Sequence, residues 1–120
     1  MEKKKETTNI EKQAALFSVL ADPTRLKLLK LLAQQQEPNA LCVNALAYQL
    51  GVTQSAISQH LRVLKSAELV KGEKRGYRVH YFVNKDGIKS CLELVTAALD
   101  VDNIAQAGTE AMDVTPRALP

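Results

Sequence analysis

The chain has no tryptophan, only two cysteines and no long run of apolar residues. Two widely spaced cysteines exclude the class of small secreted domains that depend on many disulfides. Because no apolar stretch reaches about 18 residues, the sequence predicts neither a transmembrane helix nor a membrane partner. The first residues, MEKKKETTN, lack the apolar core of a signal peptide. We therefore expect a cytoplasmic protein whose cysteines are reduced.

Signatures of catalysis are also missing. The sequence has no Walker motif, no glycine-rich nucleotide fingerprint and no recognisable nucleophile–base arrangement. The two histidines, His60 and His80, are not spaced as a local metal motif. The sequence therefore predicts neither an enzyme nor a bound cofactor, and His80 is interpreted as a structural residue of a strand.

What is present is one small, helix-rich domain. A chain of 120 residues with 46% hydrophobic and 4% aromatic residues is typical of a helical globular protein. We expect a fold that is mainly α with a small β-hairpin. The predicted organisation is a flexible N-terminus over residues 1–9, a folded domain over residues 10–101 and a loose C-terminal tail over residues 102–120.

The most informative stretch is Leu50–Leu69. A short apolar helix, Val43–Leu50, ends at Gly51, because glycine readily takes the left-handed conformation that stops a helix. Thr53 is a suitable N-cap for the next helix. Apolar residues then recur at i, i+4 and i+7 as one stripe: Ile57, Leu61 and Leu64. The pattern predicts two helices joined by a tight turn.

The opposite face of the second helix is polar and carries no carboxylate before Glu68. Its side chains donate or accept hydrogen bonds or are cationic: Gln54, Ser55, Ser58, Gln59, Arg62 and Lys65. They suit the major groove of DNA, where a helix reads base edges and contacts phosphates. His60 lies beside them as a further candidate contact. An ordinary solvated helix is the alternative, but the helix–turn–helix spacing and the missing acids favour DNA.

Charge is segregated along the chain. Residues 24–78 hold nine Lys or Arg against three Asp or Glu, a net charge of +6, whereas residues 79–120 hold three against six, a net of −3. This segregation indicates a polyanionic partner for the middle of the chain alone. An ordinary solubilising surface would not need it.

A basic hairpin is predicted directly after these helices, over Leu69–Val83, with its turn at Lys74–Gly76. Four apolar or aromatic residues alternate with others along its second strand: Tyr77, Val79, Tyr81 and Val83. Three cations lie at or near the turn: Lys74, Arg75 and Arg78. Beside a major-groove helix, such a hairpin is expected to act as a wing that contacts phosphates or the minor groove.

Three further helices complete the prediction. The first is Ile10–Ala21, and Asp22 with Pro23 marks the start of the second. The last begins at a cap on Asn84 or Asp86. Two helices carry more apolar surface than a small monomer can readily cover: Ala14, Leu16 and Leu20 in the first, and Leu92, Leu94, Val95 and Leu99 in the last. We expect these two helices to share that surface in a symmetric homodimer.

Three segments carry a resemblance to a known family. They read LADPTRLKLLKLL (Leu20–Leu32), LCVNALAYQLGVTQSAISQHLRVLKSAELV (Leu41–Val70) and KRGYRVHYFV (Lys74–Val83). In this order they resemble the ArsR/SmtB family of winged helix-turn-helix transcriptional repressors, over roughly residues 12–100. The resemblance implies a homodimer that binds an inverted-repeat operator in double-stranded DNA. It also implies release from the operator by a metal, metalloid or oxidant.

The effector sites of that family are incomplete here. Where one type of site has a CVC motif, this chain reads Cys42-Val43-Asn44, and one thiolate does not make a soft-metal or arsenic site. Where another type has ligands on the last helix, the matching residues are not metal ligands: Lys85, Gly87, Ala98 and Val101. The comparison with the family patterns therefore implies no metal site.

Cys42 and Cys91 remain as candidates for a thiol or redox effector. The alternative for each is a small buried apolar residue, and that explanation is favoured for Cys91, whereas Cys42 lies at the sensing position of the family. Joint action would require their Cα atoms to lie within about 7 Å in some state of the dimer. The sequence thus predicts a DNA-binding repressor, either effector-responsive or constitutive. The alternative is a winged-helix protein–protein adaptor that does not read DNA, since a fold does not fix a function.

Overall fold

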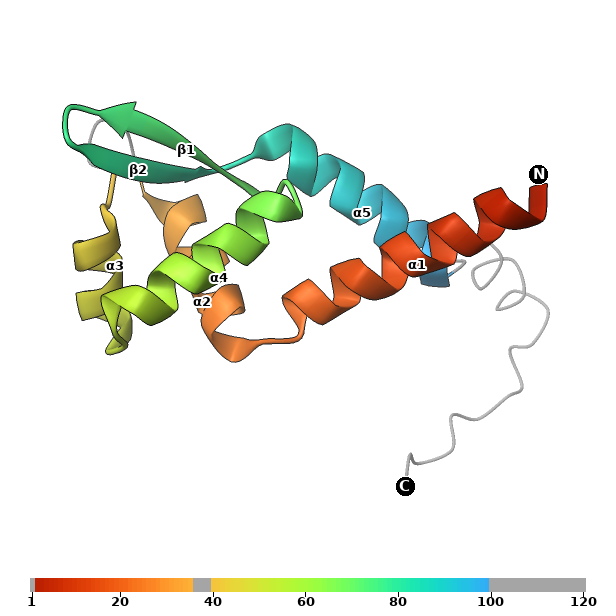
Figure 1. The fold of residues 1–120 in the computed structure, drawn as a ribbon, viewed down its shortest axis with the longest axis horizontal. Helices are drawn as coiled ribbons and strands as arrows, with labels where there is room; N and C mark the ends of the chain where they lie inside the picture. The colour runs from red at the N-terminus through yellow and green to blue at the C-terminus, as the bar shows by residue number, and fades with distance from the viewer. Residues whose placement is uncertain (1, 36–39, 100–120) are drawn as a thin grey trace, which may run out of the picture.

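The computed structural model describes residues 2–35 and 40–99, with side chains from Asn9 onward. Its elements are α1 (Glu2–Leu20), α2 (Pro23–Gln34), α3 (Val43–Leu50), α4 (Gln54–Ser66), β1 (Val70–Arg75), β2 (Arg78–Val83) and α5 (Lys85–Leu99) (Figure 1). The predicted tail over 102–120 and the domain end at residue 101 lie outside the described residues. None of the described helices combines the length and apolarity needed to span a bilayer.

Local capping explains where α2 and α4 begin. Asp22 Oδ1 accepts hydrogen bonds from the backbone N–H groups of Thr24 (2.9 Å) and Arg25 (3.1 Å). These bonds, that of Arg25 first, lower the pKa of the Asp22 carboxyl. Thr53 Oγ1 accepts from the N–H of Ala56 at 3.1 Å. Both N-caps are confirmed.

The turn between α3 and α4 and the start of α5 follow the same logic. Gly51 has φ +66°, the left-handed conformation expected after α3. At α5, Asn84 Oδ1 accepts from the N–H of Gly87 at 3.2 Å, and the Asn84 carbonyl accepts from the N–H of Ile88. Asn84 is therefore the cap of α5, and Asp86 lies in its first turn.

The first helix is longer than the sequence predicted. α1 begins at Glu2 rather than at Ile10, so the segment expected to be a flexible N-terminus over residues 1–9 is helical from Glu2 onward. Five of the eight residues from Glu2 to Asn9 are Glu or Lys, which have high helix propensity. The helix was predicted from its apolar periodicity, and that periodicity begins only at Ile10.

The hairpin turn also lies further along the chain than predicted. β1 and β2 pair in antiparallel register from Val70 opposite Val83 to Arg75 opposite Arg78. This register leaves Gly76 and Tyr77 as a two-residue turn, in place of the expected Lys74–Gly76. Gly76 has φ +66°, and a positive φ at the first loop residue is what a tight hairpin turn requires.

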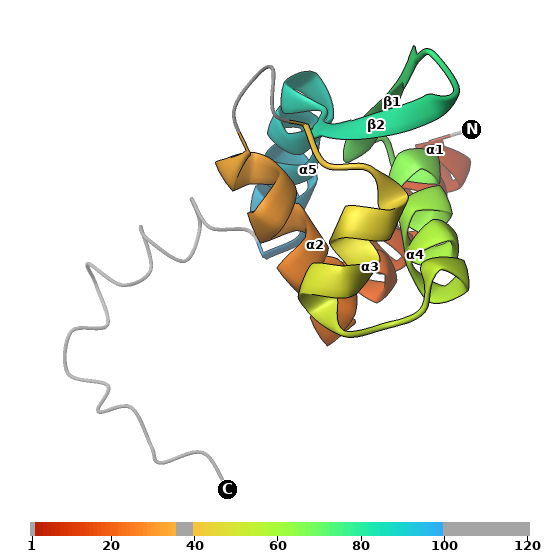
Figure 2. The same cartoon turned by 90° about the vertical axis from the view of Figure 1, so that its left-hand side faces the viewer.

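The core lies where α2, α3 and α4 meet beneath the hairpin (Figure 2). Its fully buried side chains are Leu28, Leu46, Ile57, Leu61, Leu64, Leu69 and Val70. Burying one such side chain is worth about 1.5–3 kcal/mol. α1 and α5 pack side by side away from the tip of the hairpin (Figure 1). Leu16, predicted to belong to a shared surface, is instead buried in the core of this chain.

Candidate nucleic-acid interface

The second helix of the helix–turn–helix, α4, is held to the core by one face and exposes the other. Ile57, Leu61 and Leu64 are buried, which confirms the predicted apolar stripe. The opposite face is exposed at every polar position proposed from the sequence: Gln54, Ser55, Ser58, Gln59, Arg62 and Lys65. Between Gln54 and Ser66 the helix contains no acidic residue. It therefore presents a firmly anchored array of donors, acceptors and cations.

Two of the α4 candidates differ in their surroundings from the rest. Arg62 lines a groove of about 690 Å³ together with residues of α1 and α5, so it lies at the edge of the exposed face. His60 is half-buried, and its Nδ1 accepts a hydrogen bond from Nε of Arg25 at 3.2 Å. The imidazole is therefore engaged within the protein, which sequence reasoning did not reveal.

The cations of the hairpin are unequally available. Lys74 and Arg78 are exposed, and the register places Arg78 opposite Arg75. The Arg75 guanidinium is 3.3 Å from the Glu73 carboxylate and lies 5.0 Å from the centre of the Phe82 ring. Part of the charge of Arg75 is thus balanced locally, whereas Lys74 and Arg78 face solvent.

Tyr77 at the tip of the hairpin was missed as a candidate site residue. It is fully exposed, although aromatic side chains are normally at least partly covered. The sequence signal was a Gly-Tyr pair between two arginines, which places the ring in the turn rather than in a strand. In Figure 2 the hairpin tip and α4 lie on the same side of the molecule.

The two cysteines lie in contrasting environments, and both are free thiols. Cys42 is the N-cap residue of α3 and forms an isolated β-bridge with His80. The backbone N–H of Ala45, followed by that of Asn44 and the charge of Arg78, lowers the pKa of the Cys42 thiol. Burial raises the pKa of Cys91, which packs in the core. Only Cys42 has the character of a reactive thiol.

A link between this thiol and the hairpin is visible in the structure. Nη1 of Arg78 lies 3.8 Å from Sγ of Cys42. The two residues line a shallow hollow of about 270 Å³ with Val43, Asn44, Val79 and Tyr81. Any group added to the Cys42 sulfur would therefore meet the side chain of Arg78 in the hairpin. His80, interpreted as a structural strand residue, is half-buried in β2, and its Nδ1 is buried without a hydrogen-bond partner.

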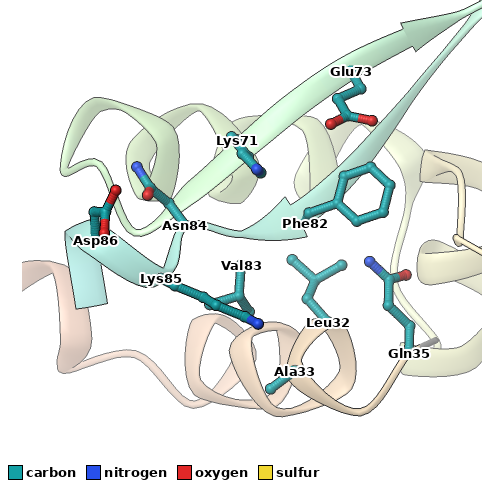
Figure 3. A pocket seen from close by; sticks show the side chains of 10 residues that line it. All are labelled: Leu32, Ala33, Gln35, Lys71, Glu73, Phe82, Val83, Asn84, Lys85 and Asp86. Carbon is teal, nitrogen blue, oxygen red and sulfur yellow. The ribbon is translucent and has the colours of Figure 1, made fainter. Parts of the chain in front are cut away.

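The chain also forms a cavity of about 480 Å³ between the end of α2, the hairpin and the start of α5 (Figure 3). Its charged side chains balance one another: Lys71 and Lys85 against Glu73 and Asp86. Its floor is apolar, formed by Leu32, Phe82 and Val83. Within residues 2–35 and 40–99 no three His, Cys, Asp or Glu side chains gather as a metal site.

The chain is similar to known transcriptional regulators. Residues 22–71 match the family model described as bacterial regulatory protein, arsR family. The chain is 41% identical over 85 residues to an uncharacterised HTH-type transcriptional regulator of Methanocaldococcus jannaschii, spanning 71% of this chain and 92% of that protein. It is 45% identical over 71 residues to a transcriptional repressor SmtB homologue of Synechocystis, spanning 59% of this chain and 51% of that protein.

Solved structures share the fold. A homodimeric winged helix-turn-helix DNA-binding domain of Mycobacterium bovis, a possible ArsR-family regulator, superposes with a TM-score of 0.62 at 29% identity over 79% of this chain and 84% of that one. NolR of Sinorhizobium fredii gives 0.63 at 29% identity over 78% and 90%. The predicted fold class is thus confirmed, and the chain belongs to the ArsR family of winged helix-turn-helix transcriptional regulators.

Proposed function

We propose that the protein is a sequence-specific transcriptional repressor that binds an inverted-repeat operator in double-stranded DNA as a homodimer. The observation that carries this proposal is the α4 face, where exposed polar and basic side chains without a single carboxylate stand on a buried apolar stripe. Amide, hydroxyl and guanidinium groups are those that read base edges in the major groove. A regulator of this kind acts in the cytoplasm, without catalysis and without a cofactor.

Each proposed contact has a distinct chemical role. The amides of Gln54 and Gln59 can bond adenine edges bidentately, and Arg62 can do the same with guanine. Ser55 and Ser58 suit either bases or phosphates. His60, the further candidate from the sequence, is already hydrogen-bonded to Arg25, so we do not propose it as a direct DNA contact. The adaptor alternative would favour carboxylates or exposed aromatics on this face, and α4 carries neither.

The test of this function is titration of the full-length protein against two duplexes. One duplex is the DNA directly upstream of its own gene, and the other is a scrambled duplex of the same composition. A repressor of this kind should prefer the operator by about 10³-fold or more at physiological salt. Equal affinity for the two duplexes would reject sequence-specific reading of that DNA.

The wing is expected to supply affinity rather than specificity. Replacing Lys74, Arg75 and Arg78 by alanine should weaken binding to operator and scrambled duplex alike. Each phosphate contact contributes about 0.9 to the slope of log affinity against log salt, so the slope should fall by up to about 2.7. The matched control replaces three exposed lysines elsewhere: Lys27, Lys30 and Lys89. If the control flattened the slope as much as the wing variant, the wing would have no special role.

The homodimer is expected to use α1 and α5. Ile10 and Leu92 are 63% and 60% exposed, and Phe17 and Leu99 are also exposed on these helices. Sedimentation at micromolar concentration should give a dimer. Leu92→Glu should shift it towards monomer, because a carboxylate would be buried without a partner. Tyr48→Glu, at an exposed aromatic on α3, is the control and should remain dimeric; a monomeric wild type would contradict the interface.

We further propose that modification of Cys42 releases the operator. Its lowered pKa leaves more thiolate at neutral pH than an ordinary thiol has, whereas the raised pKa of Cys91 leaves less. Iodoacetamide should therefore alkylate Cys42 first and at lower pH, as followed by mass spectrometry. The added group would displace Arg78 and weaken operator binding several-fold. Cys42→Ser should abolish this response and Cys91→Ser should keep it; an equal response of wild type and Cys42→Ser would exclude Cys42 as the effector site.

A further inference from the structure

One arginine, at the junction between α1 and α2, forms hydrogen bonds that connect three helices. Arg25, in the first turn of α2, donates from Nη1 to the carbonyl oxygens of Val19 (2.9 Å) and Ser18 (3.3 Å). Both carbonyls belong to the last turn of α1, where a helix leaves its C=O groups without partners. From the other edge of the guanidinium, Nε donates to Nδ1 of His60 on α4 at 3.2 Å.

This arrangement depends on the planar guanidinium. Its N–H groups point in fixed directions, so holding the two carbonyls also fixes the direction of Nε towards His60. A lysine ammonium cannot reproduce that geometry. Asp22, whose carboxylate caps α2, lies near enough to the Arg25 guanidinium for its positive charge to lower the pKa of the carboxyl further. The cluster therefore closes the junction between α1, α2 and α4.

The hydrogen bond from Arg25 to His60 matters because of where His60 lies on α4. Ser58 and Gln59 directly precede it and are proposed to face base edges, while Leu61 directly follows it and is buried. His60 is thus at the boundary between the buried stripe and the exposed face. A hydrogen bond at this boundary restrains the rotation of α4 about its own axis, because hydrogen bonds are directional. The apolar stripe alone restrains that rotation less, because hydrophobic contacts are not directional.

We propose that Arg25 is a positioning residue for DNA reading, tying α4 through His60 to the end of α1 and so fixing the angle at which α4 meets the operator. This inference rests on the proposed function, because it concerns the accuracy of base contacts. Since α1 also carries the proposed dimer surface, the same contact passes the geometry of the dimer to the reading helix. His60 serves here as an acceptor, so its ring proton is on Nε2.

Two substitutions of His60 separate positioning from direct DNA contact. His60→Asn places an amide oxygen near the position of Nδ1 and keeps the acceptor for Arg25, but it removes Nε2. His60→Gln reaches towards the position of Nε2 and loses the acceptor near Nδ1. We expect His60→Asn to bind the operator within about twofold of wild type. His60→Gln should lose about tenfold, the value of one hydrogen bond to a charged donor.

Arg25 completes the test. Arg25→Lys should also lose about tenfold on the wild-type background but should lose nothing further in His60→Gln, because the same bond is already absent. Lys27→Ala removes an exposed charge of the same helix and is the control for general electrostatics. Affinity for the scrambled duplex should stay constant in His60→Gln, whereas a partly unfolded variant would lose affinity for both duplexes.

The outcomes are distinct. If His60→Gln binds the operator like wild type while His60→Asn is impaired, His60 contacts DNA directly and the positioning role is wrong. Additive losses in the double variant Arg25→Lys with His60→Gln, or equal losses on both duplexes, would also overturn it. If the wild type itself does not distinguish the two duplexes, the proposed function fails and this inference fails with it.

Discussion

Gly87→Ala is expected to destabilise the protein by about 3 kcal/mol or more, because overpacking against backbone atoms cannot be relieved by a change of rotamer. Gly87 is in the first turn of α5, and a Cβ placed on it would lie 1.6 Å from the carbonyl oxygen and 2.7 Å from the carbonyl carbon of Glu68. Glu68 cannot easily move away, because it already holds a positive φ of 62° in the turn between α4 and β1. The methyl group must therefore push α5 off that turn.

Urea denaturation of Gly87→Ala beside wild type gives the free energy of unfolding. Gly51→Ala is the matched control, since Gly51 has a positive φ but no atom within 4 Å of an added Cβ. Its cost should be limited to the strain of the left-handed conformation, about 1 kcal/mol. If Gly87→Ala cost no more than Gly51→Ala, the close approach of α5 to the α4–β1 turn would be wrong.

The double variant Ser58→Ala with Gln59→Ala is expected to lose most of the specific part of DNA affinity. A lost base contact costs about 1–3 kcal/mol, so two such contacts should weaken operator binding by about 2–6 kcal/mol. Both side chains are exposed on α4 and have no role in the core, so the free energy of unfolding should change little. Titration against operator and scrambled duplex measures the loss.

The matched control for this variant replaces the same residue types away from α4. Gln34 at the end of α2 and Ser90 on α5 are both exposed, and Gln34→Ala with Ser90→Ala should bind the operator like wild type. Binding to the scrambled duplex should be similar in all three proteins, because phosphate contacts dominate there. An unchanged operator affinity in the Ser58 and Gln59 variant would remove these residues from the interface.

Features that depend on neighbouring residues were predictable from the sequence. The caps at Asp22 and Thr53 and the left-handed Gly51 act over two to four residues, so residue type and spacing were sufficient. The buried stripe of α4 followed from the helical period. For the same reason the exposed face of α4, and with it the main candidate interface, could be identified without the structure.

Features that depend on contacts between distant segments were not predictable. The bond from Arg25 to His60 joins residues 35 positions apart, and the sequence showed only an arginine in a basic segment. No residue near Gly87 in the sequence indicates the close approach of the Glu68 carbonyl. Leu16 was assigned to a shared surface, but periodicity cannot say which element covers an apolar face. The turn lies at Gly76 and Tyr77 because of the register between the two strands. Local alternation does not determine that register, and it predicted a turn at Lys74–Gly76.

The measurement that most directly tests the central claim is selection of preferred sequences from a pool of random duplexes. The wild type should enrich an inverted repeat whose half-sites lie about 10 base pairs, or a multiple of that, apart, since two copies of α4 would enter major grooves on one side of the duplex. The Ser58→Ala, Gln59→Ala variant should lose preference at discrete positions within each half-site. Enrichment of no common sequence by the wild type would contradict the claim that α4 reads DNA.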